Sequence, residues 1–209
     1  MPEPIVCHKK KPLGDHFGDQ GEKKDDLFPL IQLQDITEAA LNYLLTSPLS
    51  SLTPAHLAGA LSPGSRTTFA FLKRFPDEKT ILRGVFYQTL QNFKKIHKPQ
   101  TLSLKETLFE GCMDYFDLLS AHKQSYSKLL SLDVMRPTQA FLIMDHLHSL
   151  AQHILAKQDP SLRGALILRG FPLAFSYIVQ LWREDETLDQ SKTMATLDKF
   201  LEKITFADK

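Results

Sequence analysis

Apolar residues recur every three or four positions along most of the chain, which is the spacing of one face of an α-helix. The clearest early example follows Asp35 and is predicted to be capped by Asp35 or Thr37. We expect it to end at Ser47, because the residue before Pro48 disfavours helical backbone. Its apolar positions are Ile36, Ala39, Ala40, Tyr43 and Leu44. No stretch alternates apolar and polar residues as a strand would, so the pattern predicts an all-α protein.

Two short helices and a long one are predicted next. Thr53 is a good N-cap and Pro54 suits the first helical position, so a short helix is expected over Pro54–Leu61. A turn at Ser62–Ser65 leads into a second short helix, Arg66–Arg74. We expect Asp77 to cap a long helix that ends near Ile96. The residues of the second short helix expected to face inward are Phe69, Leu72 and Phe71.

Every segment beyond the hinge Lys98–Gln100 has helical periodicity. The expected helices are Leu104–Leu119, Gln124–Leu132, Pro137–Ala156, Leu162–Trp182 and Gln190–Ile204. The fourth of these is the most apolar, and a membrane span needs about 20 apolar residues with few charges. Because this helix contains Arg169 and Pro172, we interpret it as a buried helix of a soluble protein, with no stable membrane insertion.

Composition agrees with a folded protein preceded by a tail. The chain has 209 residues, 43% hydrophobic and 23% charged, which suffices for a substantial core. Residues 1–27 are polar, predict a disordered tail and lack the apolar stretch of a signal peptide. The expected domains are 28–98 and 99–209. Cys7 and Cys112 have no metal-ligand spacing and are interpreted as free thiols in a reducing compartment, which favours a cytoplasmic location.

Charge is concentrated in one part of the chain. The whole molecule has a formal net charge of +1, yet the segment 47–98 holds eight basic residues and two acidic ones, a net charge of +6. The basic residues are Arg66, Lys73, Arg74, Lys79, Arg83, Lys94, Lys95 and Lys98. Short helices followed by a long one are typical of a helix-turn-helix, and local basic excess favours phosphate binding. On charge alone, a solvated face of a helical bundle remains an equal alternative.

Several stretches resemble TetR-family transcriptional regulators. Ile36–Leu41, Leu52–Ala58 and Phe75–Leu82 are similar to the family's N-terminal domain. Trp182–Glu186, followed by Thr193–Asp198, resembles the ending of an α-proteobacterial branch. The resemblance covers about residues 30–206. It implies a three-helix DNA-binding unit, a C-terminal helical bundle for ligand binding and dimerisation, and a ligand-responsive regulator acting on double-stranded DNA.

The chain departs from the family pattern near the second short helix. About three extra residues lie around Ala60–Ser65. The family's tyrosine, which often reaches a phosphate, is Leu72 here, and leucine donates no hydrogen bond. The family's lysine at the start of the long helix falls on Glu78, with Lys79 one place later. These departures bear on the strength of DNA binding rather than on the fold.

The resemblance also implies which residues meet DNA. A homodimer would place two Arg66–Arg74 helices in successive major grooves. Residues at the start of this helix are expected at base edges or phosphates, and lysines and arginines nearby at phosphates. The expected DNA-binding residues are Thr53, Ser65, Arg66, Thr67, Thr68, Lys73, Arg74 and Lys79.

For the second half, the resemblance implies an apolar ligand pocket between helices and a dimer through the last two helices. The aromatic and methionine residues expected at the pocket are Met113, Phe116, Phe141, Met144, Phe171, Phe175 and Ile178. The residues expected at the dimer interface are Leu168, Trp182, Met194, Leu197 and Leu201. The sequence leaves open the alternative that both sets simply form the core of one chain.

A second family with this fold offers an alternative function. The ending of the chain also resembles lipid-binding auxiliary proteins of ubiquinone biosynthesis, which bind isoprenoid lipids and no DNA. The residues expected to touch lipid would be Met194, Leu197, Phe200, Leu201 and Ile204. Met194 stands where that family has tryptophan, which favours the regulator.

Enzymatic chemistry is not predicted. His146, His148 and His153 lack the spacing of four that a helical zinc pair uses. Asp114 and Asp117 share a helix face, but no base or metal ligand accompanies them. Phosphate-binding glycine loops and a nucleophile elbow are absent from the sequence. We therefore expect a protein that is not an enzyme and holds no metal or cofactor.

Overall fold

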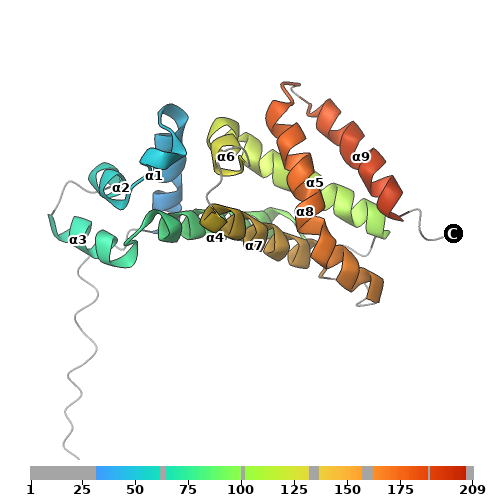
Figure 1. Cartoon of the computed structure of the whole chain (residues 1–209), viewed down its shortest axis with the longest axis horizontal. Helices are drawn as coiled ribbons and strands as arrows, with labels where there is room; N and C mark the ends of the chain where they lie inside the picture. Colours follow the sequence, from blue (N-terminus) through green and yellow to red (C-terminus); the bar gives the residue numbers. More distant parts are fainter. Residues whose placement is uncertain are drawn as a thin grey trace, which may run out of the picture. The chain divides into compact units, whose positions relative to one another are not determined.

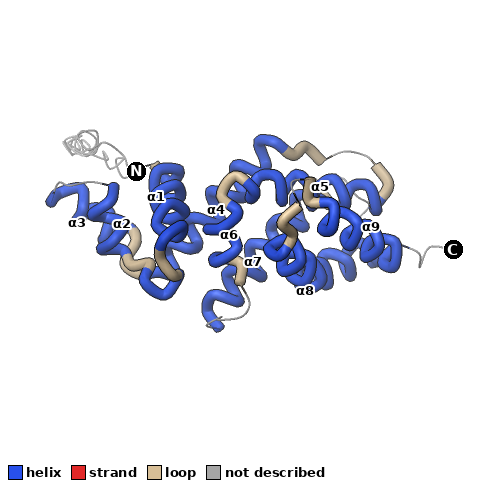
Figure 2. Tube along the Cα trace, turned by 90° about the horizontal axis from the view of Figure 1, so that it is seen from above, coloured by secondary structure: helices blue, strands red, loops and turns tan. Residues whose placement is uncertain are grey.

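The structure, a computed structural model, describes residues 32–61, 65–99, 102–131, 137–156, 162–187 and 189–205. These residues fall in one unit, Ile31–Lys209. The predicted tail 1–27 lies outside them. Within the described residues, the regular structure is helical and no strand occurs, which confirms the all-α class (Figure 2).

Helix α1 (Leu33–Thr46) begins two residues earlier than the periodicity indicated. The cap residue is Gln32, whose backbone N–H donates to the Asp35 carboxylate at 3.1 Å. Asp35 therefore acts from the first turn and not as the N-cap, while Thr37 is buried and bonds to the Leu33 carbonyl at 2.9 Å. The helix ends before Ser47 as predicted.

A 3₁₀ turn, η1 (Leu49–Ser51), leads into α2 (Pro54–Leu61), whose bounds match the prediction. Helix α3 follows over Ser65–Arg74. Asp77 caps α4 (Glu78–Ile96) by accepting a hydrogen bond from the Thr80 backbone N–H at 2.7 Å. The signals that predicted these helices are local in sequence, which explains why the predicted bounds agree with the structure.

The second half contains α5 (Leu104–Ser120), α6 (Lys123–Leu129), α7 (Pro137–Ile154), α8 (Leu162–Glu184) and α9 (Ser191–Thr205). Each corresponds to a predicted helix, with ends shifted by up to three residues. No helix among the described residues is long and apolar enough to cross a membrane.

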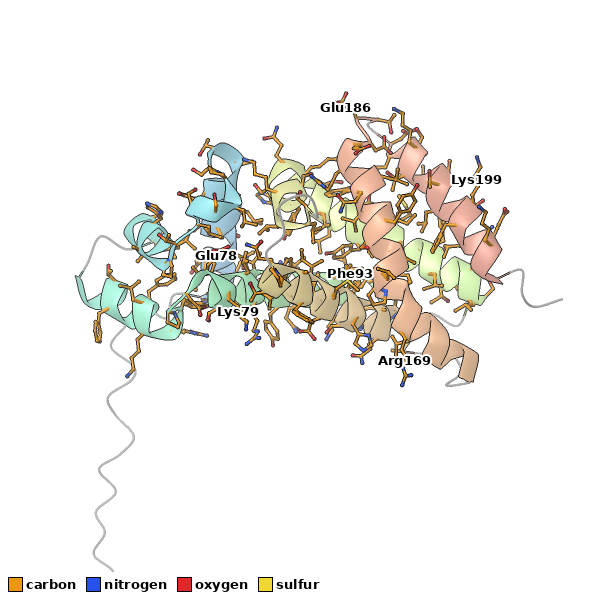
Figure 3. The ribbon with its side chains drawn as sticks, in the orientation of Figure 1. Glu78, Lys79, Phe93, Arg169, Glu186 and Lys199 are labelled. Carbon is orange, nitrogen blue, oxygen red and sulfur yellow. The ribbon has the colours of Figure 1, made fainter. Side chains whose placement is uncertain are left out.

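The helices share a continuous apolar core. Helix α4 packs against α1 and α7, α7 packs against α8, and α9 packs against α5 and α8 (Figures 1 and 2). Phe93 of α4 lies at the centre, fully buried, with its ring stacked on His97 and edge-on to Tyr115 (Figure 3). The boundary expected near residue 98 falls between α4 and α5, and the division into two domains stays a prediction.

The buried face of α3 differs from the predicted one. Phe71 is buried and stacks on Phe75, with 5.2 Å between ring centroids. Phe69 is 72% exposed and Leu72 is at the surface. The expectation that Phe71 faces inward is confirmed, whereas those for Phe69 and Leu72 are wrong, because the buried side of α3 is set by the Phe71–Phe75 pair.

Candidate nucleic-acid interface

Helices α2 and α3 form a pair at the start of the described chain. Helix α2 packs against α1 through Leu57 and Ala58, and α3 packs against α2 (Figure 1). Helix α3 thus has one buried side, carried by Phe71 and Phe75, and an opposite side that faces solvent. This arrangement, a short helix held by another with its outer side exposed, is what a recognition helix requires.

The turn into α2 is held by a hydrogen-bonded cluster. The Tyr43 hydroxyl and the His56 Nδ1 atom both donate to the Ser51 carbonyl, at 3.1 and 2.9 Å. The two rings stack with centroids 5.5 Å apart. Thr53 accepts from the His56 backbone N–H at 3.3 Å and so caps α2 as predicted. The Tyr43–His56 pair was not predicted from the sequence, because the two residues are 13 positions apart.

Exposed cations lie at the end of α3 and the start of α4. Lys73 and Arg74 form the last turn of α3, and the Arg74 guanidinium lies 5.6 Å from the centroid of the Phe75 ring. Lys79 and Arg83 are exposed one turn apart on α4, and Figure 3 marks Lys79. Among the described residues, salt bridges are made by His97 and Lys105, so these four cations keep their charge available.

Both acidic residues of this region accept hydrogen bonds from neighbouring residues of the chain. Asp77 accepts from the hydroxyl of Thr80 at 2.6 Å, in addition to the backbone bond that caps α4. These hydrogen bonds lower the pKa of Asp77 below its usual range. Glu78 accepts from the Gln139 side chain of α7 at 2.7 Å. Asp77 stays ionised and exposed beside Lys79 and Arg83, so this segment carries four cations against two acidic residues.

The predicted DNA-binding residues divide into three groups. Lys73, Arg74 and Lys79 are exposed and are separated by only a short connection between α3 and α4. Thr68 is half-buried, and the Thr53 hydroxyl is engaged in capping. The side chains of the remaining three, Ser65, Arg66 and Thr67, lie outside the described residues, although their backbone forms the first turn of α3. Their role in DNA binding stays a prediction.

The expected ligand-pocket residues are mostly packed core. Phe175 lies between Phe116 and Phe171, with ring centroids 5.2 and 5.0 Å away. These three rings and Ile178 are buried, so they fill the space that a ligand would need. Met113 and Met144 are half-buried. Phe141 is 76% exposed at the surface of α7 and not part of the packed core, and the ligand pocket stays a prediction.

Three of the five residues expected at the dimer interface belong to the core of this chain. Trp182, Leu197 and Leu201 are almost completely buried, and Trp182 stacks on Phe116 with 5.5 Å between centroids. They have no surface to offer a second chain, whereas Leu168 and Met194 are half-buried. Helix α8 instead exposes Gly170, Leu173 and Tyr177 along one side. The dimer stays a prediction, and Leu173 and Tyr177 are apolar side chains that α8 exposes.

The burial of Leu197 and Leu201 also corrects the lipid-contact face expected on α9. Half-buried Met194 and Phe200 flank them, and the side chain of Ile204 is outside the described residues. The outer side of α9 carries lysines, of which Figure 3 marks Lys199. These are Lys192, Lys199 and Lys203.

The segment Trp182–Asp198 contains a hydrogen-bonded corner between α8 and α9. Asp185 is buried between α8 and α9. Its carboxylate accepts hydrogen bonds from the backbone N–H of Thr187 at 3.0 Å and, at a shorter distance, from the Thr187 hydroxyl. It also accepts from the backbone N–H and the hydroxyl of Thr193, both at 2.8 Å. Burial alone would raise the pKa of Asp185, but these bonds outweigh it and hold the pKa well below its usual range. Lys123 donates to the Asp185 carbonyl and lies 5.3 Å from the Trp182 ring. This motif fixes a helix corner.

The histidines and aspartates considered for chemistry make hydrogen bonds within the chain. Tyr115 and His146 share a hydrogen bond of 2.8 Å, and burial lowers the pKa of His146 to about 4. His97 donates to Asp114 at 2.7 Å, and His153 donates to the His97 carbonyl at 3.2 Å. Within the described ranges, no three metal-ligating side chains come together.

The exposed cations of α3 and α4 are the strongest candidate for a site. Comparisons with models of known families and with curated protein sequences find no match to this chain.

Proposed function

We propose that this protein is a ligand-responsive, DNA-binding transcriptional regulator of TetR type. One observation carries the proposal: α3 is held on one side by Phe71 and Phe75 and exposes Lys73 and Arg74 on a segment whose acids are internally bonded. Such a cationic helix end attracts DNA phosphates and displaces their condensed counterions. Lys79, at the start of α4, extends the same charge.

In this proposal α3 enters the major groove with its solvent side. Lys73, Arg74 and Lys79 bind phosphates and set the orientation of the helix. Phe69, which the sequence analysis expected inside, projects from the outer side, where an aromatic ring is able to contact a thymine methyl group. A homodimer formed through Leu173 and Tyr177 of α8 would present two such helices to one operator.

The alternative, an isoprenoid-binding auxiliary protein of ubiquinone biosynthesis, loses support. It required an apolar lipid-contact face on α9, and Leu197 and Leu201 of that face are buried in the chain's own core. The exposed side of α9 is cationic instead, with Lys192, Lys199 and Lys203. Membrane attraction through charge alone would not select a neutral isoprenoid.

A titration of labelled genomic DNA fragments with the full chain tests the proposal. At 50 mM salt we expect specific shifted complexes, and at 200 mM salt a loss of affinity of a hundredfold or more, the order of magnitude for several phosphate contacts. Light scattering should give the mass of a dimer. Absence of DNA binding at low salt, with isoprenoid recovered by organic extraction of the pure protein, would establish the alternative.

A further inference from the structure

A small cavity of about 230 Å³ opens between α4 and α7. Among the described residues that line it, none was expected at a ligand pocket from the sequence. Sites for drug-sized molecules occupy about 300–1,000 Å³, so this cavity suits a smaller molecule. The floor of the cavity is buried and consists of Phe86, Leu90, Leu142 and His146.

Two stacked rings give the floor an aromatic surface. The ring centroids of Phe86 and His146 are 4.9 Å apart. Burial lowers the pKa of His146 to about 4, so the ring carries no charge at neutral pH. Its Nε2 atom already shares a hydrogen bond with the Tyr115 hydroxyl. Because a further aromatic ring packs favourably against such a pair, the floor favours a ligand with a flat apolar group.

The rim of the cavity carries one cation and one anion. Arg83 is exposed on α4, and Asp145 is exposed on α7. In the part of the chain that the structure describes, neither side chain makes a salt bridge or a hydrogen bond, and Arg83 acts on Asp77 only through its charge at longer range. Tyr87 and Ser149 add two hydroxyl groups. Both charges of the rim are therefore available to a ligand.

The packing of the two helices places these charges on opposite walls. Gln139 of α7 donates to Glu78, the first residue of α4, at 2.7 Å, and His153 of α7 donates to the backbone carbonyl just beyond the end of α4, at 3.2 Å. The helices therefore run parallel. Arg83 follows the first of these contacts by five residues and Asp145 by six, so the two lie at nearly the same level. Bonds at both ends hold the walls before a ligand arrives, which lowers the cost of ordering on binding.

We propose that this cavity binds a free α-amino acid with an aromatic side chain. The carboxylate of the ligand binds Arg83, and its ammonium group binds Asp145, both through charge-assisted hydrogen bonds. Its ring lies on Phe86 and His146. A simple anion or a simple cation matches the rim less well, because each leaves one of the two charges without a partner. The proposal goes beyond the DNA binding proposed above and does not rest on it.

Isothermal titration of the full chain with phenylalanine tests the proposal without DNA. Phenylpropionate, which lacks the ammonium group, and phenethylamine, which lacks the carboxylate, are matched probes. We expect each to bind about threefold to tenfold more weakly than phenylalanine, the range for a charged hydrogen bond at an exposed rim. Glycine has the same two charges and no ring, and should show no measurable binding.

Two substitutions at exposed positions locate the site. Arg83→Gln should abolish the preference for phenylalanine over phenethylamine, because the carboxylate then has no cationic partner. Asp145→Asn should abolish the preference over phenylpropionate for the matching reason. The control variants are Lys95→Gln and Glu186→Gln, which remove exposed charges away from the cavity and should keep both preferences.

Three results would overturn the assignment. One is the absence of phenylalanine binding at millimolar concentration. Another is equal binding of phenylalanine, phenylpropionate and phenethylamine. The third is a set of preferences that Arg83→Gln and Asp145→Asn leave intact. Because no DNA is present in these titrations, such a failure would leave the proposed DNA binding untouched.

Discussion

Replacement of Gly111 by alanine tests how closely α5 and α7 approach each other. A Cβ atom built at Gly111 would lie 2.8 Å from both γ carbons of Ile154 and 2.9 Å from its δ carbon. Separations below 3.0 Å force a neighbour to move. Ile154 is fully buried, and a β-branched side chain has few alternative rotamers. The added methyl group therefore cannot be accommodated cheaply.

The expected cost follows from two opposing terms. Overpacking a core costs about 1–3 kcal/mol, and three simultaneous close contacts favour the upper end. Alanine in place of glycine inside a helix stabilises the folded state by about 1 kcal/mol through its higher helix propensity. The net loss is about 2 kcal/mol, which lowers the Tm of a chain of this size by about 4–8 °C.

Thermal unfolding followed by circular dichroism provides the assay, with Gly59→Ala as control. Gly59 is also helical, but nothing lies within 4 Å of a Cβ atom built there, so this variant should gain about 0.5–1 kcal/mol. In a double-mutant cycle, Ile154→Ala should cost less in the Gly111→Ala background than alone. Stabilisation by Gly111→Ala equal to that by Gly59→Ala would refute the packing described for α5 and α7.

Three further predictions concern single residues. Asp185→Asn should destabilise the chain by about 2–4 kcal/mol, because the amide cannot accept from all four donors of Thr187 and Thr193. The folded pKa of Asp185 is depressed, so the difference from the unchanged protein in denaturant titrations should be constant between pH 5 and 8 and shrink below about pH 4; a difference independent of pH would contradict this. Burial lowers the pKa of His146 to about 4, so its unfolded form binds the extra proton and stability should fall by about 3 kcal/mol as pH drops from 7 to 4. His146→Phe should remove that part of the slope, and an unchanged slope would show that the ring is not held neutral. Phe69→Ala should abolish a preference for thymine at one operator position in a selection from random DNA, whereas Lys73→Ala should weaken binding to all sequences alike; identical selected sequences for Phe69→Ala and the unchanged protein would exclude a reading role.

Most helix boundaries were predictable because their signals are local. Thr53 and Pro54 define the start of α2, and Asp77 defines the start of α4, through contacts within three residues. The face of α3 was not predictable in the same way. Its orientation depends on Phe75, which lies just beyond the helix and pairs with Phe71.

The candidate site was predictable in its charge but not in its surroundings. The excess of lysines and arginines is visible in the sequence, whereas the bond from Gln139 to Glu78 joins residues 61 positions apart. An apolar helix face also looks the same whether it covers the chain's own core or a partner. For this reason Trp182, Leu197 and Leu201 were assigned to a dimer interface, although α5 and neighbouring helices bury them.

The dependence of DNA affinity on salt concentration tests the central claim most directly. We would compare the unchanged protein, Lys73→Gln/Arg74→Gln on α3, and Lys199→Gln/Lys203→Gln, which removes the same charge from the exposed side of α9. We expect the α3 pair to reduce the slope of log affinity against log salt by about 0.9 for each lost phosphate contact, and the α9 pair to leave that slope unchanged. An equal slope for the α3 pair and the unchanged protein, or an equal reduction by the α9 pair, would contradict the account.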